Sequence, residues 1–172
     1  GAGTATPLDM AEGYAVLANG GYRTKAYFID RIEDFNARVL ARTVPNVAGQ
    51  NAPQAIDPRN AFIVSSMLKD VVRVGTANRA MVLGRRDLAG KTGTTNDFRD
   101  AWFAGYNPNL VAITWVGFDQ PRSLGRYGYG GTAALPIWIN YMNQALKGVP
   151  DIELPIPPGI VVRQGAGLRG SD

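Results

Sequence analysis

The chain has 172 residues, and its 18 Lys and Arg against 14 Asp and Glu give a net charge of +4. It contains neither Cys nor His, which excludes disulfides, a Cys nucleophile, a thiolate metal site and a histidine general base. The length suits one domain with a sizeable core, no apolar run approaches the roughly 18 residues that span a membrane, and no basic run or zinc finger suggests a nucleic-acid partner.

The N-terminal part predicts a helix followed by a β-hairpin. Thr6 is a good N-cap, Pro7 suits the first helical position, and the glycines at 20 and 21 end the helical pattern. Residues 26–33 and 38–43 then read as two strands joined by a short polar turn.

A second helix is predicted over residues 58–74, after a loop over residues 44–55 that is rich in Asn, Pro, Gln and Gly. Asp57 is its expected cap and Gly75 its stop. An apolar stripe at helical spacing is expected to face the core: Ile63, Met67, Val71 and Val74.

The C-terminal part predicts three extended segments, a loop with four glycines, and a third helix with Trp138, Met142 and Ala145 turned inward. In the last extended segment both alternating sets of side chains are apolar, so this strand is expected to be covered on both faces of a sheet. The expected segments are residues 88–95, 101–106 and 110–118 for the strands, 119–132 for the loop, and 133–147 for the helix.

This order of elements is typical of an α/β or α+β fold with an antiparallel sheet flanked by helices. We expect residues 1–149 to belong to one domain. Residues 150–172 are rich in proline, which predicts an extended tail or linker rather than core.

The segment Gly90-Lys91-Thr92-Gly93-Thr94-Thr95 carries the candidate chemistry. On an edge strand beside a cleft, Lys91 and Gly93 face one side, and Thr92 and Thr94 face the other. Gly93 leaves room for a ligand backbone, Lys91 supplies a cation, and the Thr hydroxyls suit a carboxylate. An outward N–H near Thr94 would face a developing oxyanion. The segment therefore predicts a site for an extended peptide ending in a carboxylate. A turn-rich strand with a solvated lysine is the alternative.

The region from Lys91 to Tyr106 closely resembles the third-motif region of class A penicillin-binding proteins. Nearly all of the chain shares this resemblance, in the family's order. Its other segments are residues 6–11, 18–21, 67–76, 130–138 and 157–161.

The resemblance implies a peptidoglycan DD-transpeptidase with the fold of penicillin-binding proteins and serine β-lactamases, a five-stranded sheet between helices. In this family a serine attacks the D-Ala-D-Ala end of a stem peptide, and β-lactam antibiotics trap that serine. The resemblance also implies a glycosyltransferase domain and one inner-membrane anchor elsewhere in the protein, with this part in the periplasm. No cofactor and no metal are expected for the transpeptidase.

The resemblance also implies the roles of the site residues. Lys91 and Thr92 would orient the substrate carboxylate, and Gly93 would clear the peptide. Thr94 would give a hydroxyl and the oxyanion-hole N–H, and Thr95 would belong to the substrate-binding set. Lys91 and Thr94 are thus the expected catalytic residues.

The family has three motifs, S-x-x-K, S-x-N and K-T-G. The chain departs from this pattern because it holds the third motif and lacks the first two at their usual places. No S-x-N triplet occurs, and in the family the nucleophile lies farther upstream of K-T-G than the 90 residues that precede Lys91. We therefore expect the chain to be the C-terminal part of the domain, inactive alone, with the nucleophile upstream or on another fragment of the same protein.

One S-x-x-K does occur, at Ser66 to Lys69. Ser66 falls well inside the second predicted helix, where its N–H is already bonded within the helix and cannot serve an oxyanion hole. We interpret this pair as part of a solvated face.

Other functional interpretations stay open. A serine β-lactamase or penicillin-sensing relative would need a deacylating base, and Glu occurs only at positions 12, 33 and 153, away from the motif. A wall-binding module without the nucleophile is the non-enzymatic alternative.

Several residues near the motif also have two interpretations. Asp97 and Asp100 suit a turn and a strand start better than an acid–base pair, and the loop 119–132 is an open candidate for the cleft rim. Four aromatic residues are expected to be core rather than a binding platform: Trp102, Phe103, Trp115 and Trp138.

Overall fold

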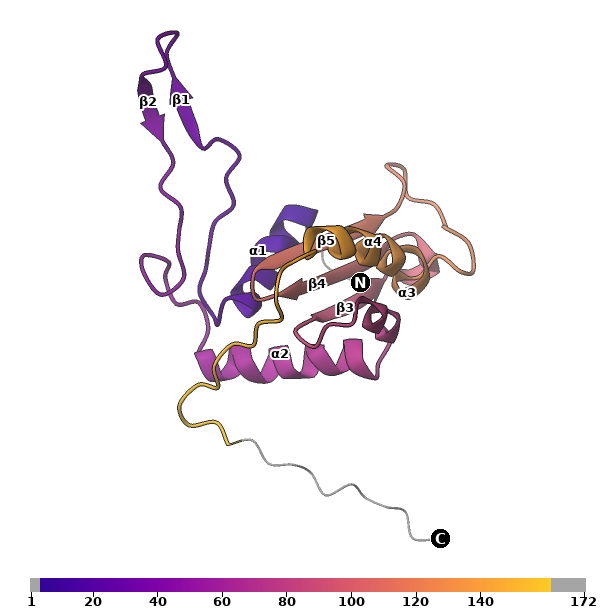
Figure 1. Ribbon diagram of the computed structural model, residues 1–172. Helices are drawn as coiled ribbons and strands as arrows, with labels where there is room; N and C mark the ends of the chain where they lie inside the picture. Colours follow the sequence, from indigo (N-terminus) through magenta and orange to yellow (C-terminus); the bar gives the residue numbers. More distant parts are fainter. Residues whose placement is uncertain (1–3, 162–172) are drawn as a thin grey trace.

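The structure is a computed structural model that describes residues 4–161. Its centre is an antiparallel sheet with the strand order β3 (Ala89–Thr94), β4 (Ala101–Asn107) and β5 (Leu110–Val116). Helices cover both faces and one edge of this sheet (Figure 1). They are α1 (Pro7–Ala18) behind it, α4 (Leu135–Ala145) in front of it, and α2 (Pro58–Arg73) along β3. The expected antiparallel sheet flanked by helices is confirmed.

Two apolar clusters hold the layers together, one on each face of the sheet. On the α4 side, Phe103 packs edge-on against Trp138, with ring centroids 4.9 Å apart, and Val72 of α2 joins this cluster. On the α1 side, Tyr106 packs with Ala18, and Leu68 of α2 lies against them. Because α2 contributes to both clusters, it closes the edge of the sheet where β3 begins.

Strand β4 is the central strand of the described sheet and its most deeply buried one. β4 pairs with β3 on one side and with β5 on the other, and nearly all of its residues are buried. β5 has a neighbour on its β4 side only within residues 4–161, and its residues are half-buried or exposed. The cover on both faces predicted for residues 110–118 is found, because Leu110, Ala112 and Val116 pack against the α4-side cluster and Val111 packs against the α1-side cluster. The strand is nevertheless only half-buried, because it lies at the outer edge of the described sheet.

Helix α1 begins as predicted, because its capping residues bond to each other. The Asp9 N–H donates to Thr6 Oγ1 at 3.1 Å, and the Thr6 N–H donates to Asp9 Oδ2 at 2.9 Å. This reciprocal capping box satisfies two backbone donors that a helix end would otherwise leave free.

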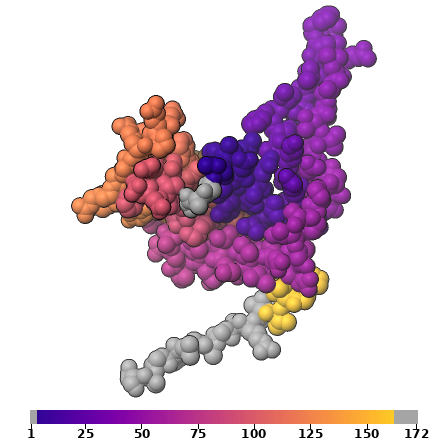
Figure 2. All heavy atoms as spheres, turned by 180° about the vertical axis from the view of Figure 1, so that it is seen from behind, coloured from indigo at the N-terminus to yellow at the C-terminus, as the bar shows by residue number. Residues whose placement is uncertain are grey.

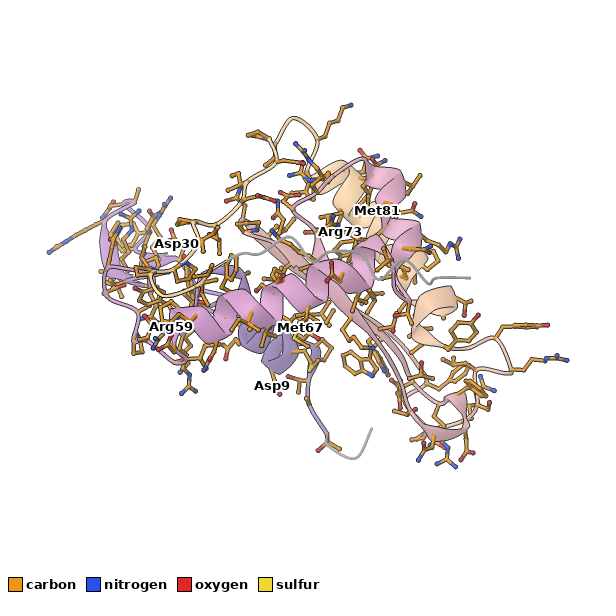
Figure 3. The ribbon with its side chains drawn as sticks, turned by 90° about the horizontal axis from the view of Figure 1, so that it is seen from below. Asp9, Asp30, Arg59, Met67, Arg73 and Met81 are labelled. Atoms are coloured by element: carbon orange, nitrogen blue, oxygen red, sulfur yellow. The ribbon has the colours of Figure 1, made fainter. Side chains whose placement is uncertain are left out.

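Helix α2 also begins as predicted, at the Asp57 cap, but the prediction of its buried face is wrong. Met67 is 64% exposed and Val74 is 82% exposed, and Ile63 is exposed as well. Of the predicted stripe, Val71 packs partly against the core, and the side of α2 that faces the sheet carries Leu68, Val72 and small or polar residues. The Tyr106 hydroxyl donates to Ser65 Oγ at 2.8 Å. Figure 3 views the molecule from the side of α2 and shows Met67 on it.

The predicted hairpin forms a separate two-stranded arm, β1 (Arg31–Glu33) and β2 (Val39–Arg42). Its turn is closed by Asp34, whose Oδ1 accepts the N–H groups of Asn36 and Arg38 at 2.9 and 3.0 Å. The arm stands away from the body (Figures 1 and 2), and every residue of both strands is exposed.

The third predicted helix is divided in two. A short helix α3 (Gly130–Ala133) begins inside the segment expected to be a loop, and α4 follows directly. Trp138 and Met142 are buried as predicted, whereas Ala145 is exposed and Leu146 fills the inward position. Two short 3-10 helices were not predicted, η1 (Asn78–Leu83) and η2 (Asn96–Phe98).

The beginning of the proline-rich tail is fastened to the sheet through Asp87. Residues 150–161 contain no helix or strand, and the rest of the tail, 162–172, lies outside the described residues. The buried Asp87 carboxylate accepts Arg85 Nη2 at 2.7 Å, Asn107 Nδ2 at 3.1 Å and the Ile152 N–H at 3.3 Å. Arg85 Nη1 also donates to the Val149 carbonyl at 2.6 Å. Residues 149–152 therefore pack on the body, and the predicted domain boundary at 149–150 stays a prediction.

No helix within residues 4–161 has the length and hydropathy needed to cross a membrane.

The Asp87 contacts predict a pH-dependent attachment of the tail. Burial raises the pKa of Asp87, but the hydrogen bonds from Arg85, Asn107 and Ile152 outweigh burial and hold this pKa below its usual value of 3.8. The stabilisation is therefore present above about pH 4 and is lost as the pH falls through the depressed pKa.

In Asp87→Asn at pH 7 we expect amide hydrogen exchange at residues 149–153 to accelerate about tenfold to a hundredfold, because a charge-assisted hydrogen bond contributes about 1.5–3 kcal/mol. The difference in exchange rate between wild type and Asp87→Asn should become smaller below pH 4. Glu153→Gln is the matched control, since Glu153 is exposed and lies 3.7 Å from Lys69. Equal exchange rates in Asp87→Asn and wild type at pH 7 would contradict the attachment of the tail through Asp87.

Candidate active site

The backbone of β3 offers free hydrogen-bonding groups along one edge. The Thr95 N–H donates to the Asp100 carbonyl at 3.0 Å, so residue 95 points its peptide groups towards the β4 side. Successive residues of a strand alternate in this respect. The N–H groups of Thr94 and Thr92 therefore point outward, away from β4, at the outer edge of the described sheet.

The side chains of β3 alternate as predicted and gather three polar groups. Lys91 is exposed, and its Nζ reaches round the edge to the Thr92 carbonyl at 2.9 Å and to Thr92 Oγ1 at 3.4 Å. The hydroxyl of Thr94 accepts the Gly130 N–H at 3.1 Å. An ammonium group, two hydroxyls and an outward N–H thus lie within four residues of one strand edge, which is a donor set suited to a carboxylate and a carbonyl oxygen.

Gly93 provides a close approach in the middle of this donor set. A Cβ built on Gly93 would lie 3.2 Å from the Cβ of Trp102, its partner across the β3–β4 pair. A larger residue would therefore press on the indole. The strand surface beside Lys91 stays flat.

Thr76 and Gly130 complete the surroundings of β3, and no role was predicted for either. Thr76 Oγ1 lies 3.0 Å from Thr92 Oγ1, and Gly130 packs directly on the peptide backbone of β3 and β4. Both lie in segments that carry the family resemblance. In the sequence, Thr76 is marked only by following the glycine that stops α2, and Gly130 only by beginning a double glycine. Neither feature shows which residue it contacts.

The hairpin between β3 and β4 is fastened by Asp100. Its N–H donates to Thr95 Oγ1 at 2.8 Å, that hydroxyl lies 3.3 Å from Asp100 Oδ2, and Trp115 Nε1 donates to Asp100 Oδ1 at 2.9 Å. The hydroxyl of Thr95 is thus engaged inside the hairpin, and a substrate-binding role for Thr95 stays a prediction. Asp97 is exposed in the turn, where it pairs with Arg99 at 3.4 Å. These contacts agree with the turn and strand-start interpretation.

The four aromatic residues fall into two groups. Phe103 and Trp138 are buried core, as predicted. Trp102 and Trp115 face each other across β4 and β5 with ring centroids 6.1 Å apart, and Trp115 is 38% exposed. The expectation that all four are core is therefore corrected for Trp115, which lies on an outer strand.

The loop from residue 117 to 129 ends beside the candidate site. The Leu124 N–H donates to the Phe98 carbonyl at 2.8 Å, which ties the loop to the β3–β4 turn, and Gly130 follows the loop directly. Tyr127 and Tyr129 are exposed on it. The sequence leaves open whether this loop lies at the rim of the site, and these contacts fit that position.

Ser66 and Lys69 lie apart from this donor set. Ser66 is exposed in the middle of α2, and Lys69 pairs with Glu153 of the tail. A cavity of about 420 Å³ opens beside them, between α1, α2 and the tail, where Tyr106 and Pro108 line it. Tyr106 pairs with Ala89 at the beginning of β3, so the cavity is at the opposite end of the strand from Thr94. This cavity is therefore not the candidate site.

Comparisons of the sequence and of the fold with known proteins identify the same family. The family model described as "Penicillin binding protein transpeptidase domain" matches residues 1–143. The chain is 58% identical over 165 residues to "Penicillin-binding protein 1A" of Neisseria lactamica, which covers 96% of this chain and 21% of that protein. The chain thus spans about a fifth of the length of this curated relative.

Two solved structures resemble the fold. The crystal structure of penicillin-binding protein 1A from Haemophilus influenzae matches with a TM-score of 0.89 and 36% identity, over 94% of this chain and 29% of that one. The D,D-transpeptidase domain of a peptidoglycan glycosyltransferase from Eggerthella lenta matches with a TM-score of 0.63 and 27% identity, over 85% and 33% of the two chains.

The packing of Gly130 on β3 gives a test with a neighbouring control. A Cβ at Gly130 would lie 2.4 Å from the Trp102 carbonyl oxygen and 2.7 Å from that of Gly93, whereas one at Gly131 would lie 3.5 Å from the Thr76 carbonyl oxygen. In the full-length protein we expect Gly130→Ala to lower stability by about 1–3 kcal/mol, the usual cost of overpacking, and to displace α3 from Thr94. Gly131→Ala should stay near wild type. Thermal unfolding measures the stability of both variants. Equal unfolding midpoints for Gly130→Ala and Gly131→Ala would contradict the close approach of Gly130 to β3.

Proposed function

Since the chain belongs to the penicillin-binding protein transpeptidase domain family, we propose that it is the K-T-G part of a peptidoglycan DD-transpeptidase. That enzyme would cross-link stem peptides through an acyl-serine intermediate, and β-lactams would acylate the same serine. The observation that carries the proposal is the edge of β3, where Lys91, Thr92 and the outward N–H of Thr94 lie together.

The donor set suggests how the peptide end would bind. An extended stem peptide would lie along the free edge of β3 as an added strand. Its terminal carboxylate would accept hydrogen bonds from the hydroxyls of Thr92 and Thr94 and interact with the Lys91 ammonium. The N–H of Thr94 would stabilise the scissile carbonyl oxygen as it becomes negative in the tetrahedral intermediate.

The nucleophile would come from another part of the longer protein, which would also carry S-x-x-K and S-x-N. Two observations support this. The chain spans about a fifth of its curated relative, and α2 exposes Ile63, Met67 and Val74, an apolar face that a neighbouring segment would cover. We therefore propose that the described chain alone is inactive.

The same proposal extends to the rest of the enzyme. The steps assigned to β3 use only side chains and backbone groups, so we propose that the transpeptidase needs no cofactor and no metal. A glycosyltransferase domain and a single inner-membrane anchor would lie outside this chain, with the transpeptidase in the periplasm. The name of the Eggerthella lenta relative, which joins a D,D-transpeptidase domain to a glycosyltransferase, supports that pairing.

A β-lactamase role has no support from the positions of the glutamates. Glu12 accepts the Ala26 N–H at 2.8 Å, Glu33 pairs with Arg31 in the arm, and Glu153 lies beside Lys69. None of these contacts brings a general base to β3, so we favour transpeptidation.

Removal of the Lys91 cation should slow acylation. We expect Lys91→Ala in the full-length protein to reduce the second-order rate of acylation by benzylpenicillin about tenfold to a hundredfold, the size of one charge-assisted hydrogen bond. Stopped-flow or fluorescent-penicillin kinetics measure this rate. An unchanged rate would overturn the assigned role.

Ser66→Ala is the matched control for Lys91→Ala. Its hydroxyl is exposed on α2, so acylation should stay within about twofold of wild type, and alanine is also the better helix former. Mass spectrometry of the acylated protein locates the adduct. A penicilloyl group on Ser66 would contradict a nucleophile outside this chain.

The outward N–H of Thr94 predicts a selective effect of proline. Proline removes this donor, together with the hydroxyl that accepts the Gly130 N–H, but it breaks no β3–β4 hydrogen bond, because edge strands tolerate proline where the N–H faces away from the sheet. We expect Thr94→Pro to slow acylation about 10²–10³-fold, as for the loss of one oxyanion-hole donor. Circular dichroism checks that the fold is kept, and a folded variant with normal acylation would refute the oxyanion-hole assignment.

A further inference from the structure

The hydroxyl of Thr76 is placed against the K-T-G strand from outside the motif. Thr76 Oγ1 lies 3.0 Å from Thr92 Oγ1. We propose that Thr76 is a positioning residue of the carboxylate site, whose hydroxyl directs the single O–H of Thr92 towards the bound carboxylate. This inference rests on the proposed function of β3 and names a residue outside the motif that acts through it.

The turn after α2 is built so that Thr76 reaches β3. Gly75 passes so close to α2 that an added Cβ would lie 2.8 Å from the Cα of Val71. Ala77 is fully buried, and its N–H donates to the Val71 carbonyl at 3.1 Å. The backbone is thus fixed on both sides of Thr76, which places its side chain within reach of Thr92.

The hydrogen-bonding capacity of the three groups gives Thr76 its role. A hydroxyl has one hydrogen to donate and two lone pairs to accept with, and an ammonium group only donates. Lys91 Nζ lies 3.4 Å from Thr92 Oγ1, so Thr92 is the acceptor in that contact. When Thr76 also donates to Thr92, both lone pairs of Thr92 are used. The hydrogen of Thr92 is then left for the ligand.

The exposure of the pair fits a site that a ligand enters. Thr76 is exposed and Thr92 is half-buried, so solvent or a ligand reaches them directly. Without the Thr76 hydroxyl, the Thr92 O–H is released to other rotamers, and the carboxylate loses a donor that was already aligned.

Carboxylate discrimination in the full-length enzyme tests this inference. The acylation rates of benzylpenicillin and of its methyl ester are measured, and their ratio reports recognition of the carboxylate separately from the chemistry at the β-lactam ring. We expect Thr76→Val, which keeps the side-chain shape, to lower this ratio about fivefold to tenfold, the size of one ordinary hydrogen bond. The rate with the ester should stay near wild type.

Three further variants separate a hydroxyl effect from a structural one. Thr76→Ser should restore the ratio to within about twofold of wild type. Thr76→Ala should reproduce the effect of valine, and it replaces valine as the test if that variant fails to fold. Thr43→Val should leave the ratio unchanged, because Thr43 directly follows β2 of the arm, which stands away from the body (Figure 1).

The outcomes distinguish this inference from the proposed function. If Lys91→Ala and Thr92→Val lower the ratio and Thr76→Val does not, the role of Thr76 is overturned and the site stands. An equal loss in Thr76→Ser and Thr76→Val also overturns it, because the hydroxyl would then not be the cause. If none of these variants changes the ratio, the carboxylate site on β3 is itself wrong.

Discussion

Within residues 4–161, strand β3 has a strand partner along one edge only, and the arrangement of the surrounding elements follows from that constraint. Unpaired peptide groups must meet water, a side chain or a ligand, because burying them without a partner is costly. Helix α2 covers the strand where it begins, through Leu68 and Val72. Farther along, the outward N–H groups of Thr92 and Thr94 stay available, and the polar side chains of the site gather at those residues.

Three close contacts hold this open edge in place from outside the strand. Gly130 packs on the peptide groups of β3 and β4, Thr76 reaches Thr92 from the turn after α2, and Asp100 joins the end of β3 to Trp115. Two of these contacts depend on a missing side chain, at Gly75 and Gly130, so small residues are as much a part of the site as polar ones. Since each contact comes from a different element, the strand is held in position although one of its edges is free.

The sequence predicts what is local and misses what depends on neighbours. The Thr6 cap of α1 and the alternation of Lys91 and Thr92 concern residues a few positions apart, and both are found. The stripe of Ile63 and Met67 faces outward, because periodicity identifies an apolar face but not the element that covers it. The contacts of Thr76 with Thr92 and of Gly130 with Thr94 join residues 16 and 36 positions apart, and no pattern in one sequence specifies such pairs.

The anchoring of the tail at Asp87 has a mechanical consequence. Asp87 binds Asn107 of the sheet and the backbone of Ile152, and Arg85 binds the carbonyl of Val149. Tension applied to the chain after residue 153 would reach α2 through the Lys69–Glu153 pair, and the sheet through these bonds at the end where β3 begins and β4 finishes. The load path bypasses Thr92 and Thr94 at the other end of β3.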